Sequence, residues 1–182
     1  MAHERTDSYL KDSISLFQYY KKLGENAIAQ CPDAGLFATL DEENNSIAIV
    51  VKHMTGNMLS RWTDFLTTDG EKANRNRDSE FEVPPKTRAE LLDLWDAGWK
   101  CVFTALEALT DESMTKTVTI RGEEHSEMQA INRQIAHYSY HVGQIVLTAK
   151  HFAGANWKAL TIPKKQSAAF NRDVGAGKKS QR

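Results

Sequence analysis

The sequence predicts an all-α domain with four long helices, and three observations lead to this fold class. Apolar residues recur every three to four positions in four segments, near 7–30, 46–66, 87–109 and 126–152. Residue types that favour helix N-caps stand at or near the start of these segments. Only one short stretch, 115–125, has the β-branched alternation that is typical of a strand. We therefore expect a helical bundle with at most a short β-hairpin before the fourth helix.

The first helix is predicted to begin near Asp7, because aspartate is a favourable N-cap residue. Apolar positions from Leu10 to Ile28 then follow the helical spacing. The run Cys-Pro-Asp-Ala-Gly at 31–35 is expected to break this helix. A connector then extends to Asn45 and ends in polar residues.

The second helix is predicted to run from about Ser46 to about Leu66, with His53 inside its apolar stripe. The connection that follows, 67–86, is long and polar, and such connections are usually functional or disordered. About 20 extended residues reach up to ~66 Å, whereas a helix of this length spans ~30 Å. The connection can therefore cross the whole domain and allow the third helix to run parallel to the second.

Capping signals mark the last two helices. Thr87 and Glu90 match a capping box and begin the third helix. The alternating stretch at 115–125, with an Arg-Gly turn in it, predicts a short hairpin. Ser126 and Gln129 match a second capping box and begin the fourth helix.

Length and composition indicate one ordinary globular domain. The chain has 182 residues, which suits a single domain with a sizeable core, and we assign this domain to 1–170. The polar, basic residues 171–182 are expected to form a disordered tail. Apolar and aromatic residues such as Trp62, Trp95, Trp99 and Trp157 suggest more apolar surface than one bundle hides, which favours a homodimer.

Charge and cysteine content exclude several classes of partner. The net charge is −1, which gives no electrostatic case for a nucleic-acid partner. No apolar run is long enough to span a bilayer, and residues 1–7 lack the apolar core of a signal peptide. Cys31 and Cys101 form no C-x-x-C pair, which favours free thiols. We expect a cytoplasmic protein whose partner is a small molecule.

His137 and His141 lie four residues apart in the fourth helical segment and therefore share one helix face. Two neutral imidazoles in this arrangement can bind one zinc, nickel, copper or iron ion. Two half-buried histidines with hydrogen-bonded neighbours would give the same pattern. The residue after the first histidine is Tyr138, whereas zinc metalloproteases have a glutamate there, so a protease site is not indicated.

A third protein ligand would have to come from elsewhere in the chain. His125 and His151 are separated from the pair by about 18 Å and about 15 Å of continuous helix, and His3 is near the terminus. His53 lies on another helix in an apolar, core-facing context. A lone histidine there is by default a hydrogen-bonded core residue, but the pair requires a third donor. His53 is therefore the third ligand that we choose.

Several segments of the chain form a recognisable pattern. They are 52–66 with His53, 69–72, 74–78 and 120–123, and the pattern H-x-x-x-H-x-G-Q-I at 137–145. Together they resemble the DinB-like metal-binding four-helix-bundle superfamily, in a branch that is catalogued only as a domain of unknown function. The resemblance covers nearly the whole chain. Lys165 departs from the pattern, since relatives more often have glycine at that position.

The resemblance implies an up-down-down-up four-helix bundle, commonly dimeric, with one divalent metal ion held by three histidines. This order of helices agrees with the crossover inferred from the length of 67–86. The superfamily includes transferases that use low-molecular-weight thiols such as bacillithiol, and a mycothiol-dependent isomerase. Many other members have no known activity.

Four functions are compatible with this pattern. The first is a metal-dependent transferase in which an open metal position activates a thiol cofactor. The others are a metal-dependent hydrolase, a metal- or ligand-binding stress-response protein without turnover, and a purely structural bundle. The metal would be zinc, with nickel or iron as alternatives. Candidate residues around the ligands are Asn57, Arg61 and Gln144 for catalysis and Arg75 and Arg77 for cofactor binding.

Overall fold

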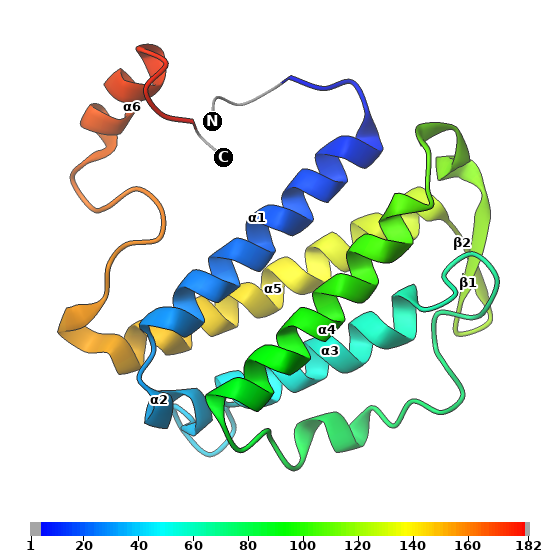
Figure 1. Cartoon of the computed structure of the whole chain (residues 1–182), viewed down its shortest axis with the longest axis horizontal. Coiled ribbons are helices and arrows are strands. Elements are labelled where there is room, and N and C mark those ends of the chain that lie inside the picture. The colour runs from blue at the N-terminus through cyan, green and yellow to red at the C-terminus, as the bar shows by residue number, and fades with distance from the viewer. Residues whose placement is uncertain (1–4, 181–182) are drawn as a thin grey trace.

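The computed structural model describes residues 5–180 and is mostly helical, with one small antiparallel sheet (Figure 1). This confirms the coarse prediction of a helical domain with a hairpin. The α-helices are α1 (Tyr9–Gln30), α2 (Asp33–Phe37), α3 (Ile47–Trp62), α4 (Arg88–Glu107), α5 (Glu127–Ala153) and α6 (Ser167–Gly175). Short 3₁₀ helices are η1 (Asp78–Phe81), η2 (Asp111–Thr115) and η3 (Gly154–Asn156), and the strands are β1 (Thr117–Ile120) and β2 (Glu123–Ser126).

The four long helices pack side by side, with α3 mainly against α4 and α1 mainly against α5. In Figure 1, α3 and α4 both begin at the end of the molecule where α2 lies and both end towards the hairpin. Helices α1 and α5 run in the opposite direction. The segment between α3 and α4 returns along the outside of the molecule, which brings residues far apart in sequence over α3.

Three predicted helix starts agree with the structure, and the fourth is shifted by one residue. Ser46 and Thr87 cap α3 and α4, and the box at Ser126 is complete, with both reciprocal hydrogen bonds present. Thr87 forms only half of a box, because the Glu90 carboxylate accepts from the Lys86 amide instead. Helix α1 is capped by Ser8 rather than by Asp7, since the Ser8 hydroxyl reaches the amide of the third helical residue at 3.0 Å.

Helix α3 ends at Trp62, four residues before the predicted end at Leu66. Thr63 has an extended backbone and Asp64 has a positive φ of 47°, so the chain turns sharply away from the helix axis. Ser60 and Arg61 both donate to the Gly70 carbonyl and hold the returning segment against the helix end. These contacts join residues about ten positions apart, and helical periodicity contains no signal for them.

Helix α2 forms where a break and a connector were expected, and it buries Leu36. The guanidinium of Arg88, at the start of α4, donates to the carbonyls of Ile28 and Cys31 at 3.0 and 2.6 Å. It also pairs with Asp33 at 2.6 Å. Arg88 therefore satisfies carbonyls at the end of α1 and fixes α2 beside it.

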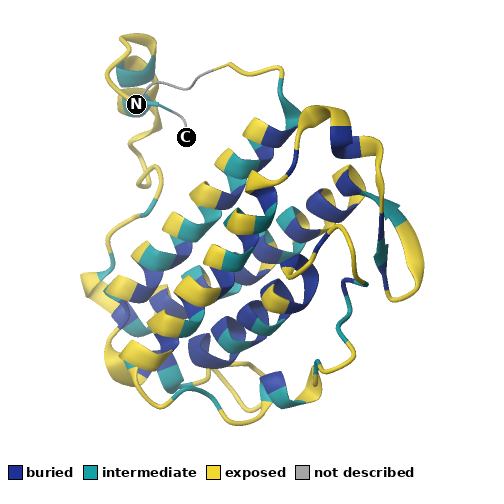
Figure 2. Ribbon diagram, turned by 45° about the vertical axis from the view of Figure 1, so that its right-hand side comes forward, coloured by how far each residue is buried: buried dark blue, intermediate teal, exposed yellow. Residues whose placement is uncertain are grey.

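The interior is rich in aromatic side chains, and Figure 2 shows the buried faces of the long helices turned towards one another. Trp62, Trp95 and Trp99 are all fully buried in the single chain. The indole of Trp62 donates to the Tyr138 hydroxyl at 2.9 Å, and this hydroxyl donates to the Asn57 amide oxygen at 3.2 Å. The hydrogen-bonded chain leads from the aromatic core to the face of α3 that carries His53.

The hairpin has the predicted position, with β1 and β2 paired antiparallel and Ile120 opposite Glu123. Its turn residues Arg121 and Gly122 have positive φ angles of 57° and 77°. Such angles suit a tight hairpin turn and are easiest for glycine. The Asp69 carboxylate accepts from both turn amides at 2.8 Å, so the hairpin is fastened to the segment that follows α3.

Helix α6 follows the main helices and buries none of its residues. The predicted boundary at 170 falls inside this helix, so residues 171–175 of the expected tail are helical. Residues 181–182 of that tail, like His3, lie outside the described residues. Within 5–180, no helix combines the length and the apolar character needed to cross a membrane.

Candidate metal centre

Helices α3 and α5 bring His53, His137 and His141 together. Each histidine places one ring nitrogen within 4.8 Å of those of the other two. The Nε2 atoms of His137 and His141 are 3.0 Å apart, and the His53 ring lies 4.9 Å from the His141 ring, centre to centre. The cluster could hold one metal ion, and it consists of the three residues that the sequence predicted.

The Glu80 carboxylate orients His53. Its Oε2 atom lies 2.8 Å from His53 Nδ1, and His53 also packs against the Phe81 ring. If Nδ1 carries the proton and donates it to this carboxylate, the lone pair of Nε2 is free for a metal ion, as in many carboxylate–histidine–metal sites. Glu80 is buried and pairs with Arg75 through Nε and Nη2 at 2.8 and 3.0 Å. Burial raises the pKa of Glu80, but the hydrogen bonds from His53 and Arg75 outweigh it and lower this pKa.

Gly56 makes room for this carboxylate. A Cβ atom at Gly56 would lie 2.7 Å from Glu80 Cδ, too close for two carbon atoms. Helix α3 therefore has a glycine where Glu80 of η1 packs closely against it. This close approach brings the Glu80 carboxylate within reach of His53, which lies one turn before Gly56 on α3.

The other two histidines have different surroundings. His141 Nδ1 lies 2.7 Å from the Gln144 amide oxygen, which orients its ring, whereas the buried His137 Nδ1 has no hydrogen-bond partner among the described residues. Burial lowers the pKa of His137 to about 3, with a further contribution from His141 and His53. Burial also lowers the pKa of His141. Both rings are therefore neutral near pH 7, which is the form that binds metal.

The donor set suits a borderline divalent ion. Three neutral imidazole nitrogens are typical of catalytic zinc sites, which keep a further position open for water or substrate. Nickel and iron accept the same donors, so the geometry does not select one ion. The rings of His53 and His141 are both held in orientation by hydrogen bonds. This arrangement fits metal binding better than it fits core packing, because packing alone does not require nitrogen atoms to converge.

A polar cavity of about 310 Å³ lies beside the histidines. Its buried lining includes His53, Asn57, Arg61 and Gln134, together with the half-buried His137. Four more arginines complete the lining: Arg75, Arg77, Arg121 and Arg133. The cavity provides the histidine cluster with space for a small ligand.

The predicted polar residues take different roles in this structure. Asn57 accepts from Tyr138 across the helices, and Gln144 faces His141 rather than the cavity. Arg61 donates to the Gly70 carbonyl and pairs with Glu71 at 2.9 Å. Arg75 forms ion pairs with Glu71 and Glu80 and so helps to hold Glu80 beside His53; its part in cofactor binding stays a prediction.

Sequence reasoning missed Glu80, Gln134, Arg121 and Arg133. Glu80 and Arg121 lie in a 3₁₀ helix and a hairpin turn, where helical periodicity gives no orientation. Gln134 lies three residues before His137 on α5, so the i, i+3 neighbour relation could have found it. Arg133 is exposed, and no local sequence pattern indicates that it lines a cavity.

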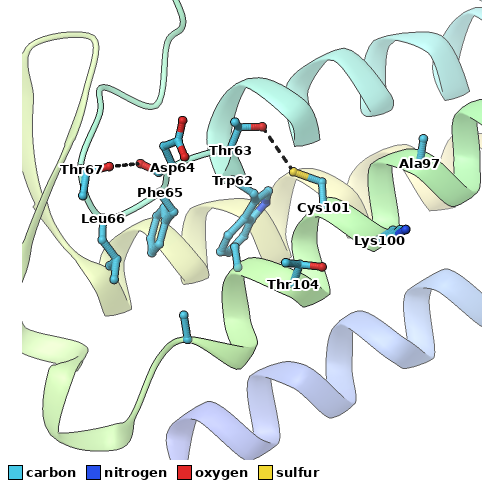
Figure 3. A pocket seen from close by; sticks show the side chains of 12 residues that line it. Trp62, Thr63, Asp64, Phe65, Leu66, Thr67, Ala97, Lys100, Cys101 and Thr104 are labelled. Carbon is cyan, nitrogen blue, oxygen red and sulfur yellow. Dashed lines mark hydrogen bonds between the residues drawn. The ribbon is translucent and has the colours of Figure 1, made fainter.

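A larger cavity of about 600 Å³ lies elsewhere, between the end of α3 and helix α4 (Figure 3). Its lining is mainly apolar and runs from Trp62 to Thr67 and along α4 past Cys101. The Cys101 thiol lies 3.6 Å from the Thr63 hydroxyl, as the dashed line in Figure 3 shows. None of the three histidines lines this cavity, so it is separate from the candidate metal centre.

The comparisons with known proteins identify the family. No curated protein and no solved structure matches the chain. One family model, described as "Protein of unknown function (DUF1572)", matches residues 4–166, which is most of the chain and includes all three histidines and the whole cavity lining. The chain therefore belongs to the DUF1572 family of proteins of unknown function.

Proposed function

We propose that His53, His137 and His141 bind one divalent metal ion at the centre of a metal-dependent enzyme. The observation that carries the proposal is the convergence of three imidazole nitrogens beside a polar cavity. A structural site would surround the ion with four protein ligands, whereas three leave a position open. Among the described residues, no fourth histidine, cysteine or carboxylate joins this cluster.

The reaction that we propose is attack of a low-molecular-weight thiol on an electrophilic carbon of a small molecule. A C–S bond forms, the bond from that carbon to a leaving group breaks with its electron pair going to the leaving group, and the thiol proton passes to solvent. A bound ion would deprotonate a coordinated thiol, and the thiolate is the nucleophilic form. The protein residues hold the ligand set: Glu80 fixes the His53 ring, and Gln144 fixes the His141 ring. The resemblance to the DinB-like superfamily supports the thiol, since thiol transferases occur in it.

Two alternatives use the same residues. A hydrolase would have water in the open position, with its pKa lowered to ~7. A metal- or ligand-binding stress-response protein would have no turnover. Among residues 5–180, no further base joins the cluster beside the already paired Glu80, which keeps the binding protein as an alternative.

A substrate panel assayed with and without thiols separates these functions. We expect turnover that requires both a divalent ion and a thiol, measured as loss of thiol and formation of a thioether. The His137→Ala variant should be inactive, whereas His125→Ala should retain activity, because His125 lies in β2 outside the cluster. Turnover without any thiol would favour the hydrolase, and full metal loading without turnover would favour the binding protein.

We also propose that the chain is an up-down-down-up four-helix bundle of the DinB-like kind. The equal direction of α3 and α4 and the long return segment between them support this topology (Figure 1). The metal cluster built from α3 and α5 is a second point of agreement with that superfamily.

A homodimer remains our proposal for the assembly, although one argument for it was wrong. Trp62, Trp95 and Trp99 are at most 2% exposed in the single chain, so they need no partner for burial. The proposal now rests on the resemblance and on exposed apolar residues such as Leu66 and Leu147. Light scattering at micromolar concentration should give twice the chain mass of 20.5 kDa, and a mass of one chain would contradict the dimer.

A further inference from the structure

We infer that the cavity beside the histidines binds a small molecule through a dianionic group, which is a phosphate monoester or a dicarboxylate, between Arg77 and Arg133. The inference deepens the proposed function, because the anion would belong to the substrate or cofactor of the same site. Binding of the anion itself requires no metal ion. It can therefore be tested independently of the metal.

The charges around the cavity are unbalanced. Five guanidinium groups line it, and the carboxylates that contact them or their backbone are Glu71, Glu80 and Asp69. Glu71 is shared by Arg61, Arg75 and Arg121, and Glu80 is shared by Arg75 and His53. Five positive charges against three negative charges leave an excess of two, which matches a dianion.

Arg77 and Arg133 carry this excess. Among residues 5–180, neither guanidinium forms an ion pair, and the recorded contact of Arg77 is with the face of the Phe81 ring at 4.9 Å. Stacking on Phe81 orients the Arg77 guanidinium without using its hydrogen-bond donors. The two arginines come from the α3–α4 segment and from α5, and both side chains line one cavity.

The exposure of the lining side chains decreases from the mouth of the cavity to its floor. The residues Arg77, Arg121 and Arg133 are exposed, so they form the part of the lining that meets solvent. Arg61 and Gln134 are 4% and 3% exposed, and the Arg61 Nε atom and the Gln134 amide oxygen have no partner among the described residues. Buried polar atoms are normally satisfied, so these two atoms indicate a place for a polar ligand or for ordered water. A ligand held at the mouth by its anionic group would reach the histidines with its other end.

Arginine suits this task better than lysine. Its planar guanidinium binds carboxylate and phosphate oxygens in a bidentate manner, and charge-assisted hydrogen bonds are about twice as strong as neutral ones. A monoanion would leave one of the two positive charges without a partner, and a neutral ligand would leave both.

The test measures anion binding to metal-free protein by calorimetry at low ionic strength. The probes are inorganic phosphate, malonate and the neutral malonamide. We expect phosphate or malonate to bind at one site per chain, and malonamide not to bind. The dianion that binds more tightly shows whether the natural group is a phosphate or a dicarboxylate. Added sodium chloride should weaken the binding, because salt screens exposed charges.

Charge-removing variants locate the site. Arg77→Gln and Arg133→Gln should each weaken binding by ~10-fold or more, and the double variant should show none. Arg172→Gln is the matched control, since it removes the same group from the exposed helix α6 and should change the affinity less than about twofold. Circular dichroism melts verify that each variant is folded.

The outcomes separate this inference from the metal proposal. A His137→Ala variant should still bind the dianion. A wild-type chain that binds the anion but no metal ion would leave the inference standing and sink the metal proposal. Metal binding in a chain that binds neither phosphate nor malonate would overturn the inference. Equal affinity in wild type and in the Arg77→Gln, Arg133→Gln double variant would also overturn it.

Discussion

Replacing His53, His137 or His141 with alanine is expected to reduce bound metal from about one ion per chain to near background. Each substitution removes one of three nitrogen donors, and two donors cannot complete the site. The measurement is elemental analysis of protein purified without a histidine tag. Thermal stability is a second readout, because an ion at 100 times its Kd stabilises the folded chain by ~2.7 kcal/mol.

Two other histidines serve as controls. His125 lies in β2 with its Nδ1 atom 3.0 Å from the Glu123 carbonyl, and His151 is exposed in the last turn of α5. His125→Ala and His151→Ala should therefore keep the wild-type metal content. Full metal occupancy in His53→Ala, with loss in the other two variants, would show that the third donor is a different residue.

Replacing Glu80 with alanine is expected to have the second-largest effect, on both metal affinity and stability. Glu80 is 6% exposed and its carboxylate contacts His53 and Arg75, so its removal leaves a buried guanidinium without its main partner. Loss of one partner of a buried ion pair destabilises a protein by ~3–5 kcal/mol. Loss of a carboxylate that orients a metal-binding histidine reduces metal affinity by ~10–100-fold.

Urea unfolding of the metal-free protein and metal titration measure the two effects separately. Glu82→Ala is the control, because Glu82 is exposed two residues further on and forms no ion pair among the described residues. It should leave stability and affinity close to those of the wild type. Wild-type metal affinity in a folded Glu80→Ala variant would show that Glu80 supports the fold alone and does not orient His53 for metal binding.

Local features were readable from the sequence because their causes are local. The helix starts at Ser46 and Thr87 depend on a side chain that caps an amide three residues later. The hairpin depends on two turn residues and β-branched neighbours. His137 and His141 share a face because an α-helix has about 3.6 residues per turn, so residues four apart lie almost one above the other. Each of these predictions depends on residues only a few positions apart.

The sequence also selected His53 for the cluster, by its apolar context and by the family pattern. Spacing alone could not do so, because 84 positions separate His53 from His137 and no local rule connects two helices. The structure now brings all three rings together. That they bind metal is still a prediction.

The tertiary structure alone decided what surrounds those histidines. Glu80 reaches His53 because the segment between α3 and α4 returns over Gly56, where the absence of a side chain permits close approach. Arg121 and Arg133 join the cavity from a turn and from another helix. Arg75, a predicted cofactor-binding residue, forms ion pairs with Glu71 and Glu80 that no local pattern indicated.

The end of α3 and the burial of the tryptophans have the same explanation. Periodicity continued to Leu66, but Ser60 and Arg61 bind the Gly70 carbonyl and turn the chain after Trp62. The sequence by itself determined the helices, the hairpin and the histidine pair, whose causes lie within a few residues. Ion pairs, cavity lining and burial depend on side chains brought together from distant positions, so only the folded chain decided them.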